Sequence, residues 1–106
     1  MAENIKIVVF VPEKNADDIR KAIAASGGGR IGNYTYCTFS SKGIGRFKPG
    51  IGAKPAIGRV GEIESVPEER IEFICERKLV KTVIASIKKV HPYEEVALDI
   101  YPLEEV

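Results

Sequence analysis

The spacing of apolar residues changes several times along the chain, and each change predicts a different element. Residues 5–11 are almost all apolar and mostly β-branched, which is typical of a central strand covered on both faces. Over residues 16–26 the apolar positions recur every three or four residues, which predicts an amphipathic helix. A longer stripe of the same spacing, with lysines opposite it, predicts a second helix over residues 78–90 that ends before Pro92.

The remaining β-favouring segments predict further strands. They cover residues 33–39, 61–66, 69–76 and 95–101, with a turn at Pro67 between the second and third of them. Residues 41–58 instead combine five glycines with two prolines and show no period, so we expect a long loop. Loops of more than about 12–15 residues inside a compact domain are usually functional or disordered.

In this order the segments predict one α+β domain over residues 1–106 with the ferredoxin-like βαββαβ arrangement, a four-stranded antiparallel sheet with both helices on one face. A glycine-rich insertion and an extra short strand are expected between strands two and three. The second face of the sheet has no helix over it, so Val8 and Phe10 are exposed unless the long loop or a partner covers them. Oligomerisation would bury them.

Charge is unevenly distributed, although the net charge of the 106 residues is only +1. Between Ile19 and Gly61 there are eight basic residues and no acidic ones, which leaves eight basic against fifteen acidic residues, a net −7, in the remainder. A near-zero net charge argues against a dedicated nucleic-acid or membrane-surface protein. No apolar stretch approaches the ~20 residues of a membrane span, so we expect a cytoplasmic protein without a membrane partner.

The basic, glycine-rich loop is a candidate site for a small anionic ligand, because glycines let backbone N–H groups turn toward an anion. The residues selected on this ground are Gly43, Gly45, Arg46, Lys48 and Lys54. The loop matches neither Gly-x-Gly-x-x-Gly nor the phosphate-binding loop that ends in Gly-Lys-Ser/Thr. A loop whose turns need positive φ accounts for the glycines without any ligand.

RNA binding is disfavoured by the third strand of the predicted sheet. The RNA recognition motif shares this order of strands and helices, and it stacks bases on aromatic residues of that strand. Here the corresponding segment, residues 68–76, reads Glu-Glu-Arg-Ile-Glu-Phe-Ile-Cys-Glu. Its glutamates would repel phosphate.

The single histidine, His91, belongs to the sequence His-Pro-Tyr-Glu-Glu after the second predicted helix. With Glu94 or Glu95 it could shuttle a proton or hold a divalent metal, so it joins the candidate ligand-binding residues. One histidine and two carboxylates are too few for a closed metal site unless a symmetry mate contributes. In the structural alternative His91 closes the helix and Tyr93 packs. No particular cofactor follows from these residues.

The two cysteines, Cys37 and Cys75, fall on predicted neighbouring strands and show no Cys-x-x-Cys spacing. We interpret them as reduced, buried thiols, since no activating group accompanies either one in the sequence. A redox pair or a soft-metal site is the alternative.

Several of these motifs together resemble one family. The segments are residues 31–39, Gly-Ile-Gly-Arg-Phe-Lys-Pro-Gly over 43–50, Pro-Ala-Ile-Gly over 55–58, residues 69–72, and His-Pro-Tyr-Glu-Glu-Val-Ala-Leu-Asp-Ile-Tyr-Pro-Leu over 91–103. In this order and spacing they resemble the insert domain of YqfO-type proteins of the NGG-one-interacting-factor-three family. We therefore expect a stand-alone version of that domain. The resemblance implies a ferredoxin-like fold similar to the CutA and PII proteins, with a tendency to form trimers.

The resemblance does not carry the family's catalytic labels to this chain, because the dinuclear metal site of the full-length proteins belongs to the flanking domain. We expect a small non-catalytic ligand-binding or regulatory module, assembled as a homotrimer. Two alternatives stay open. One is an enzyme that uses His91 with Glu94 as acid or base, with the basic loop holding its substrate. The other is a detached partner of a dinuclear-metal hydrolase-like protein.

Overall fold

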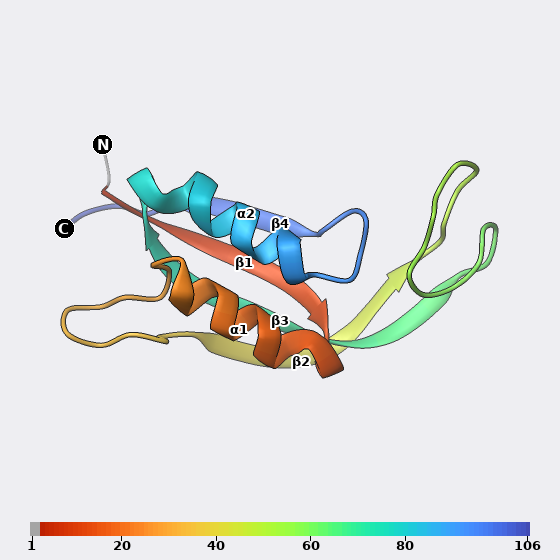
Figure 1. Cartoon of the computed structure of the whole chain (residues 1–106), viewed down its shortest axis with the longest axis horizontal. Helices are drawn as coiled ribbons and strands as arrows, with labels where there is room; N and C mark the ends of the chain where they lie inside the picture. The colour runs from red at the N-terminus through yellow and green to blue at the C-terminus, as the bar shows by residue number, and fades with distance from the viewer. Residues whose placement is uncertain (1–2) are drawn as a thin grey trace.

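The computed structural model describes residues 3–106 as four strands and two helices (Figure 1). Their order is β1 (Asn4–Pro12), α1 (Ala16–Ala25), β2 (Phe39–Phe47), β3 (Glu64–Glu76), α2 (Val80–Val90) and β4 (Leu98–Pro102). A short 3-10 turn leads into each helix, η1 (Glu13–Asn15) before α1 and η2 (Arg77–Leu79) before α2.

The strands form one antiparallel sheet in the order β2-β3-β1-β4. The helices α1 and α2 lie side by side over one face of it (Figure 1). This arrangement confirms the predicted ferredoxin-like α+β fold. The longer helix, α2, has 11 residues, and within residues 3–106 no helix combines the length and apolarity needed to cross a membrane.

The core lies between the two helices and the sheet. On β1, Ile5, Ile7, Val9 and Val11 point toward the helices and are at most 1% exposed. They pack against alternate residues of β3 and the apolar stripes of both helices, namely Ile71, Phe73, Cys75, Ile19, Ile23, Val83 and Ile87. Full burial of an Ile or Val side chain contributes about 1.5–3 kcal/mol. The periodicities of β1, α1 and α2 therefore identify the residues that stabilise the fold.

On the second face of the sheet, charged side chains of the sheet itself lie beside the apolar residues of β1. Val8 is fully buried and Phe10 is half-buried. The ammonium of Lys6 lies 3.4 Å from a carboxylate oxygen of Glu72, and the guanidinium carbon of Arg70 lies 6.0 Å from the centre of the Phe10 ring. The aliphatic parts of these long charged side chains shield the apolar residues of β1.

The second strand begins later in the chain than predicted. Residues 33–38 form a loop. The one isolated β-bridge among the described residues joins Ile31 to Tyr34. The strand β2 instead occupies Phe39–Phe47, much of which belongs to the segment predicted to be a loop. The prediction of a strand over 33–39 is therefore wrong for all but Phe39, and the prediction of a loop is wrong for the first part of 41–58.

Tertiary pairing explains both errors. Tyr36 has a φ of 60°, a left-handed conformation incompatible with a strand. Gly43 and Gly45 favour strands poorly, yet β2 pairs with β3 without interruption from Phe39–Glu72 to Phe47–Glu64. This ladder outweighs the local preferences of the glycines.

The third strand is a single long one, so the prediction of an extra short strand and a turn at Pro67 is wrong. Glu64–Glu76 runs continuously and pairs with β2 along its first part and with β1 along its last. Pro67 is tolerated because β1 ends opposite Glu68. Pro67 has no partner on β1, so no hydrogen bond to β1 is lost although proline has no N–H.

The far ends of β2 and β3, with the connection between them, project beyond the helices (Figure 1). We call residues 44–67 the arm. Because of the arm the molecule measures 46 × 25 × 23 Å, and its radius of gyration is 14.7 Å, against about 13 Å for a compact domain of this length. Residues 91–97, the connection between α2 and β4, lie beside the arm, where the rings of Tyr93 and Phe47 are in contact.

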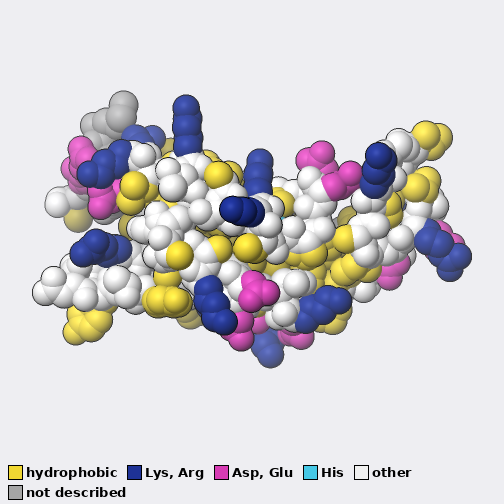
Figure 2. Space-filling view, in the orientation of Figure 1, with side chains coloured by type: hydrophobic (Ala, Val, Ile, Leu, Met, Phe, Trp, Pro, Cys, Tyr) yellow, Lys and Arg dark blue, Asp and Glu magenta, His cyan; other side chains and the backbone are white. Residues whose placement is uncertain are grey.

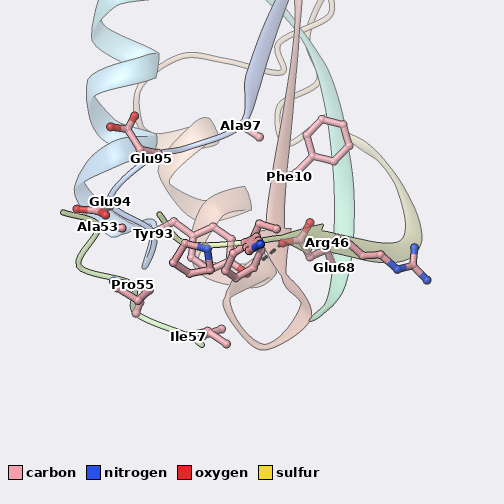
Figure 3. Close-up of a pocket in the computed structure, with 15 residues that line it drawn as sticks. Phe10, Arg46, Ala53, Pro55, Ile57, Glu68, Tyr93, Glu94, Glu95 and Ala97 are labelled. Carbon is pink, nitrogen blue, oxygen red and sulfur yellow. Dashed lines mark hydrogen bonds between the residues drawn. The ribbon is translucent and has the colours of Figure 1, made fainter. Parts of the chain in front are cut away.

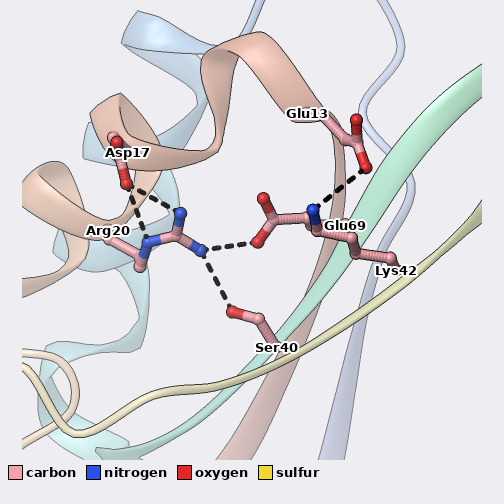
Figure 4. A network of polar contacts seen from close by, with 6 residues as sticks. All are labelled: Glu13, Asp17, Arg20, Ser40, Lys42 and Glu69. Atoms are coloured by element: carbon pink, nitrogen blue, oxygen red, sulfur yellow. Dashed lines mark hydrogen bonds and ion pairs between the residues drawn. The ribbon is translucent and has the colours of Figure 1, made fainter.

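A polar network ties α1 to β2 and β3 (Figure 4). Arg20 donates hydrogen bonds to Asp17 at 2.7 Å, to Ser40 at 3.1 Å and to Glu69 at 2.7 Å. The hydrogen bond to Glu69 and, next, the one to Asp17 raise the pKa of Arg20. The hydrogen bond between Arg20 and Asp17 lowers the pKa of Asp17. Glu69 is only 9% exposed, so Arg20 compensates a nearly buried charge.

Candidate ligand-binding cavity

A cavity of about 340 Å³ lies where the arm meets residues 91–97 and the end of β1 (Figure 3). Its lining consists of Phe10, Gly45, Arg46, Phe47, Lys48, Pro49, Ala53, Pro55, Ala56, Ile57, Glu68, Tyr93, Glu94, Glu95 and Ala97. Nine of these fifteen side chains are aromatic, aliphatic or proline rings, as is usual in small-molecule sites. The motifs over 43–50 and 91–95, distant in sequence, thus meet at one cavity.

His91 supports this cavity from behind and does not line it. It is only 7% exposed. The backbone N–H of Tyr93 donates to its Nδ1 at 3.1 Å, so the ring proton sits on Nε2, which donates to the Phe10 carbonyl at 2.7 Å. Both ring nitrogens therefore hold the backbone of residues 91–93 against β1, whereas only the backbone N–H of His91 closes the end of α2, by donating to the Ile87 carbonyl at 3.0 Å.

Tyr93 is the residue of this motif that reaches the cavity. Its ring contacts that of Phe47 edge to face, with centres 5.5 Å apart and planes at 62°, and lies 5.2 Å from the ring of His91. Its hydroxyl donates to Glu68 Oε2 at 3.1 Å. Burial and, next, the contact with Glu68 raise the pKa of Tyr93 well above its ordinary value of 10.0. Tyr93 is thus held as a neutral donor to Glu68.

Gly45 makes room for the carboxylate of Glu68. A side chain beginning at Gly45 would collide with that carboxylate, whereas nothing lies within 4 Å of the corresponding point at Gly43. Glu68 is only 8% exposed although its side chain is acidic. The glycine in the arm and the acidic residue on β3 therefore form one structural unit.

The structure brings part of the predicted site together. Gly45, Arg46, Lys48 and Glu94 line the cavity. The guanidinium of Arg46 points away from Tyr93 in Figure 3, because Arg46 follows Gly45 on a strand and faces the other side of the hairpin.

The other predicted residues contribute differently. Lys54 acts through its backbone, whose N–H donates to Glu94 Oε1 at 2.8 Å and so anchors the tip of the arm to residues 91–97. Gly43 does not line the cavity. A metal at His91 and Glu94 stays a prediction; within residues 3–106 no three His, Cys, Asp or Glu side chains group as metal ligands would.

The sequence did not single out Glu68 or Phe47 as site residues, and it predicted Tyr93 only as a packing residue in the structural alternative. Glu68 was hidden by the predicted turn at Pro67, since a residue in a turn has no strand partner. Its pairing with Gly43, and so its closeness to Gly45, depends on the register of β2 and β3. The sequence could have indicated Glu68 only if the glycine-rich segment of β2 had been predicted to pair with the acidic segment of β3.

The cysteines lie outside the cavity lining. Cys75 is buried on β3, and burial, followed by the charge of Glu76, raises the pKa of its thiol. Cys37 is half-buried in the loop before β2, so the prediction that both cysteines lie on strands is wrong for Cys37.

The sheet order and the two helices on one face define a ferredoxin-like α+β domain. No protein-family model matches the chain. The solved structure of the periplasmic divalent cation tolerance protein CutA from Archaeoglobus fulgidus has this fold. It superposes with a TM-score of 0.70 at 16% identity, over 97% of this chain and 86% of that one.

Much higher sequence identity is found with a segment of longer bacterial proteins. The chain is 51% identical over 100 residues to the Bacillus subtilis protein named GTP cyclohydrolase 1 type 2 homolog. The aligned region covers 94% of this chain and 27% of that protein. The structure of a Bacillus cereus protein related to NIF3 superposes with a TM-score of 0.84 at 48% identity, over 97% of this chain and 26% of that one. The chain spans about a quarter of the length of these relatives.

Proposed function

We propose that this domain is a non-catalytic regulatory module that binds a small ligand in the cavity between the arm and residues 91–97. The observation that carries the proposal is the meeting of the 43–50 and 91–95 motifs at one cavity of about 340 Å³, a size within the range of small-molecule sites. Three of its lining residues also contact one another, since Tyr93 packs against Phe47 and donates a hydrogen bond to Glu68.

The arrangement of His91 favours binding over catalysis. A general acid or base needs a ring nitrogen that can reach the substrate. In this chain both nitrogens of the single histidine are engaged with backbone groups of residues 10 and 93. The enzyme alternative that uses His91 with Glu94 is therefore disfavoured.

The module is further proposed to assemble as a homotrimer. Hydrophobic side chains are visible at both ends of the molecule in Figure 2. Exposed large apolar side chains include Tyr34 and Phe39, at 75% and 68% exposure, and Ile51 and Ile63 on the arm. Such surfaces are typical of interfaces. Light scattering should give about three times the chain mass of 11.6 kDa; a monomer at micromolar concentration would contradict the trimer.

Binding in the cavity is tested by screening small polar and apolar fragments by NMR. Hits should shift the amide signals of the lining residues, and Ala53→Phe, which places a ring in the cavity, should abolish those shifts. Ala85→Phe, on the exposed side of α2, is the matched control. A screen without any hit at the lining residues would overturn the proposed function.

A further inference from the structure

We propose that the ligand of this cavity is an organic cation, a small amine with an apolar body, recognised by the carboxylate of Glu68 and the aromatic rings beside it. This inference rests on the proposed function and names the ligand of the same site by its chemical class.

The carboxylate of Glu68 is the charged group best placed to recognise such a ligand. The residue is 92% buried, and it lines the cavity. Its Oε2 accepts one hydrogen bond, from the neutral hydroxyl of Tyr93, and no ion pair to it forms among residues 3–106. A buried carboxylate with a single neutral donor is poorly compensated. An ammonium group would supply the missing charge and further hydrogen bonds.

The rings beside Glu68 suit the rest of a cation. Phe47 and Tyr93 pack edge to face on the arm side of the cavity, and Phe10 lines it from β1. Aromatic faces attract an ammonium group and its neighbouring methylenes. A cavity of about 340 Å³ has room for an amine that carries an aromatic ring or a short alkyl chain.

The charges at the cavity also favour a cation over the anion predicted from the sequence. Three carboxylates, of Glu68, Glu94 and Glu95, line it, whereas the guanidinium of Arg46 is directed away from Tyr93 (Figure 3). Lys48, the other basic lining residue, is exposed. The Lys48 ammonium would repel a bound amine, whereas it would attract a bound anion.

Three probes of nearly equal size separate these possibilities: phenethylammonium, phenylacetate and uncharged phenethyl alcohol, titrated into the full chain and followed by NMR. We expect phenethylammonium to bind at least about tenfold more tightly than either of the others, since hydrogen bonds to a charged group are the stronger kind. Equal or tighter binding of phenylacetate or of the alcohol would overturn the inference while leaving ligand binding by the cavity intact. If none of the three shifts a lining residue, the cation assignment fails, whereas ligand binding by the cavity is decided separately by the fragment screen.

Two variants give opposite results for cation and anion recognition. Glu68→Gln should weaken phenethylammonium about tenfold, and Glu104→Gln, an exposed carboxylate outside the lining, should leave it unchanged. Lys48→Ala, which changes an exposed side chain, should strengthen phenethylammonium severalfold. Weaker binding of the amine to Lys48→Ala, or unchanged binding to a folded Glu68→Gln, would contradict the assignment.

Discussion

At the scale of single residues, His91 shows how a side chain typical of active sites can serve the backbone. Its two hydrogen bonds join the end of α2 to β1 and set the position of Tyr93. His91→Ala should therefore lower the free energy of unfolding by about 2–3 kcal/mol, because the Phe10 carbonyl and the Tyr93 N–H lose their partner. Urea denaturation measures the loss, with Val90→Ala, a partly exposed neighbour, as control. A stability equal to that of the control variant would show that these bonds are unimportant.

Gly45 and Gly43 form a natural matched pair. Gly45→Ala should destabilise the domain by about 1–3 kcal/mol, since its methyl group needs the space of the Glu68 carboxylate. Gly43→Ala should be neutral or slightly stabilising, because the added methyl group meets open space in the folded state. The same methyl group lowers the conformational entropy of the unfolded chain. Thermal melts of both variants test the difference; equal losses would mean that strand propensity alone requires the glycines.

Tyr93 should make the free energy of unfolding decrease at alkaline pH. Its pKa is raised on folding, so the folded state favours the neutral phenol, and this stabilisation is complete below pH 10.0 and declines as the pH rises above it. The free energy of unfolding of the natural chain should fall more steeply between pH 9 and 11 than that of Tyr93→Phe. Parallel slopes in denaturation series at these pH values would contradict this.

At the scale of elements, the sequence identified the parts whose period is set by the core. The strand β1 and both helices follow from the sequence because Ile5, Ile19 and Ile87 each belong to an apolar stripe that faces the core. The strands β2 and β3 were misplaced because their extent depends on pairing with each other. The candidate motifs were recognised, but the contact of Gly45 with Glu68 follows from strand register, which is not a local property of the chain.

The Arg20 network makes a prediction about how α1 is held on the sheet. Arg20→Ala should cost about 2 kcal/mol of unfolding free energy, since it leaves the nearly buried carboxylate of Glu69 uncompensated. Lys21→Ala, on the exposed side of the same helix, should change stability by less than about 0.5 kcal/mol. Adding Glu69→Gln to Arg20→Ala should restore part of the loss in urea denaturation. No recovery would show that Glu69 does not need a cation.

At the scale of the whole molecule, the core and the cavity lie in separable regions. No member of the core cluster comes from residues 24–70, whereas residues 48–57 supply six of the cavity-lining side chains. Replacing residues 48–63 by Asn-Gly, which favours a tight turn between the paired Phe47 and Glu64, should preserve cooperative thermal unfolding. The same variant should lose every ligand of the cavity. Loss of cooperative unfolding would mean that the tip of the arm is needed for folding.

The long strand β3 also bears on how such a domain can diverge. Residues 68–72 pair with both β1 and β2, whereas 64–67 pair with β2 alone and 73–76 with β1 alone. An insertion within the doubly paired stretch would shift two ladders at once and turn core residues such as Ile71 outward. An insertion in the tip would shift neither ladder. Natural variants of this domain should therefore vary in length between residues 48 and 63 and keep a constant length between residues 68 and 72.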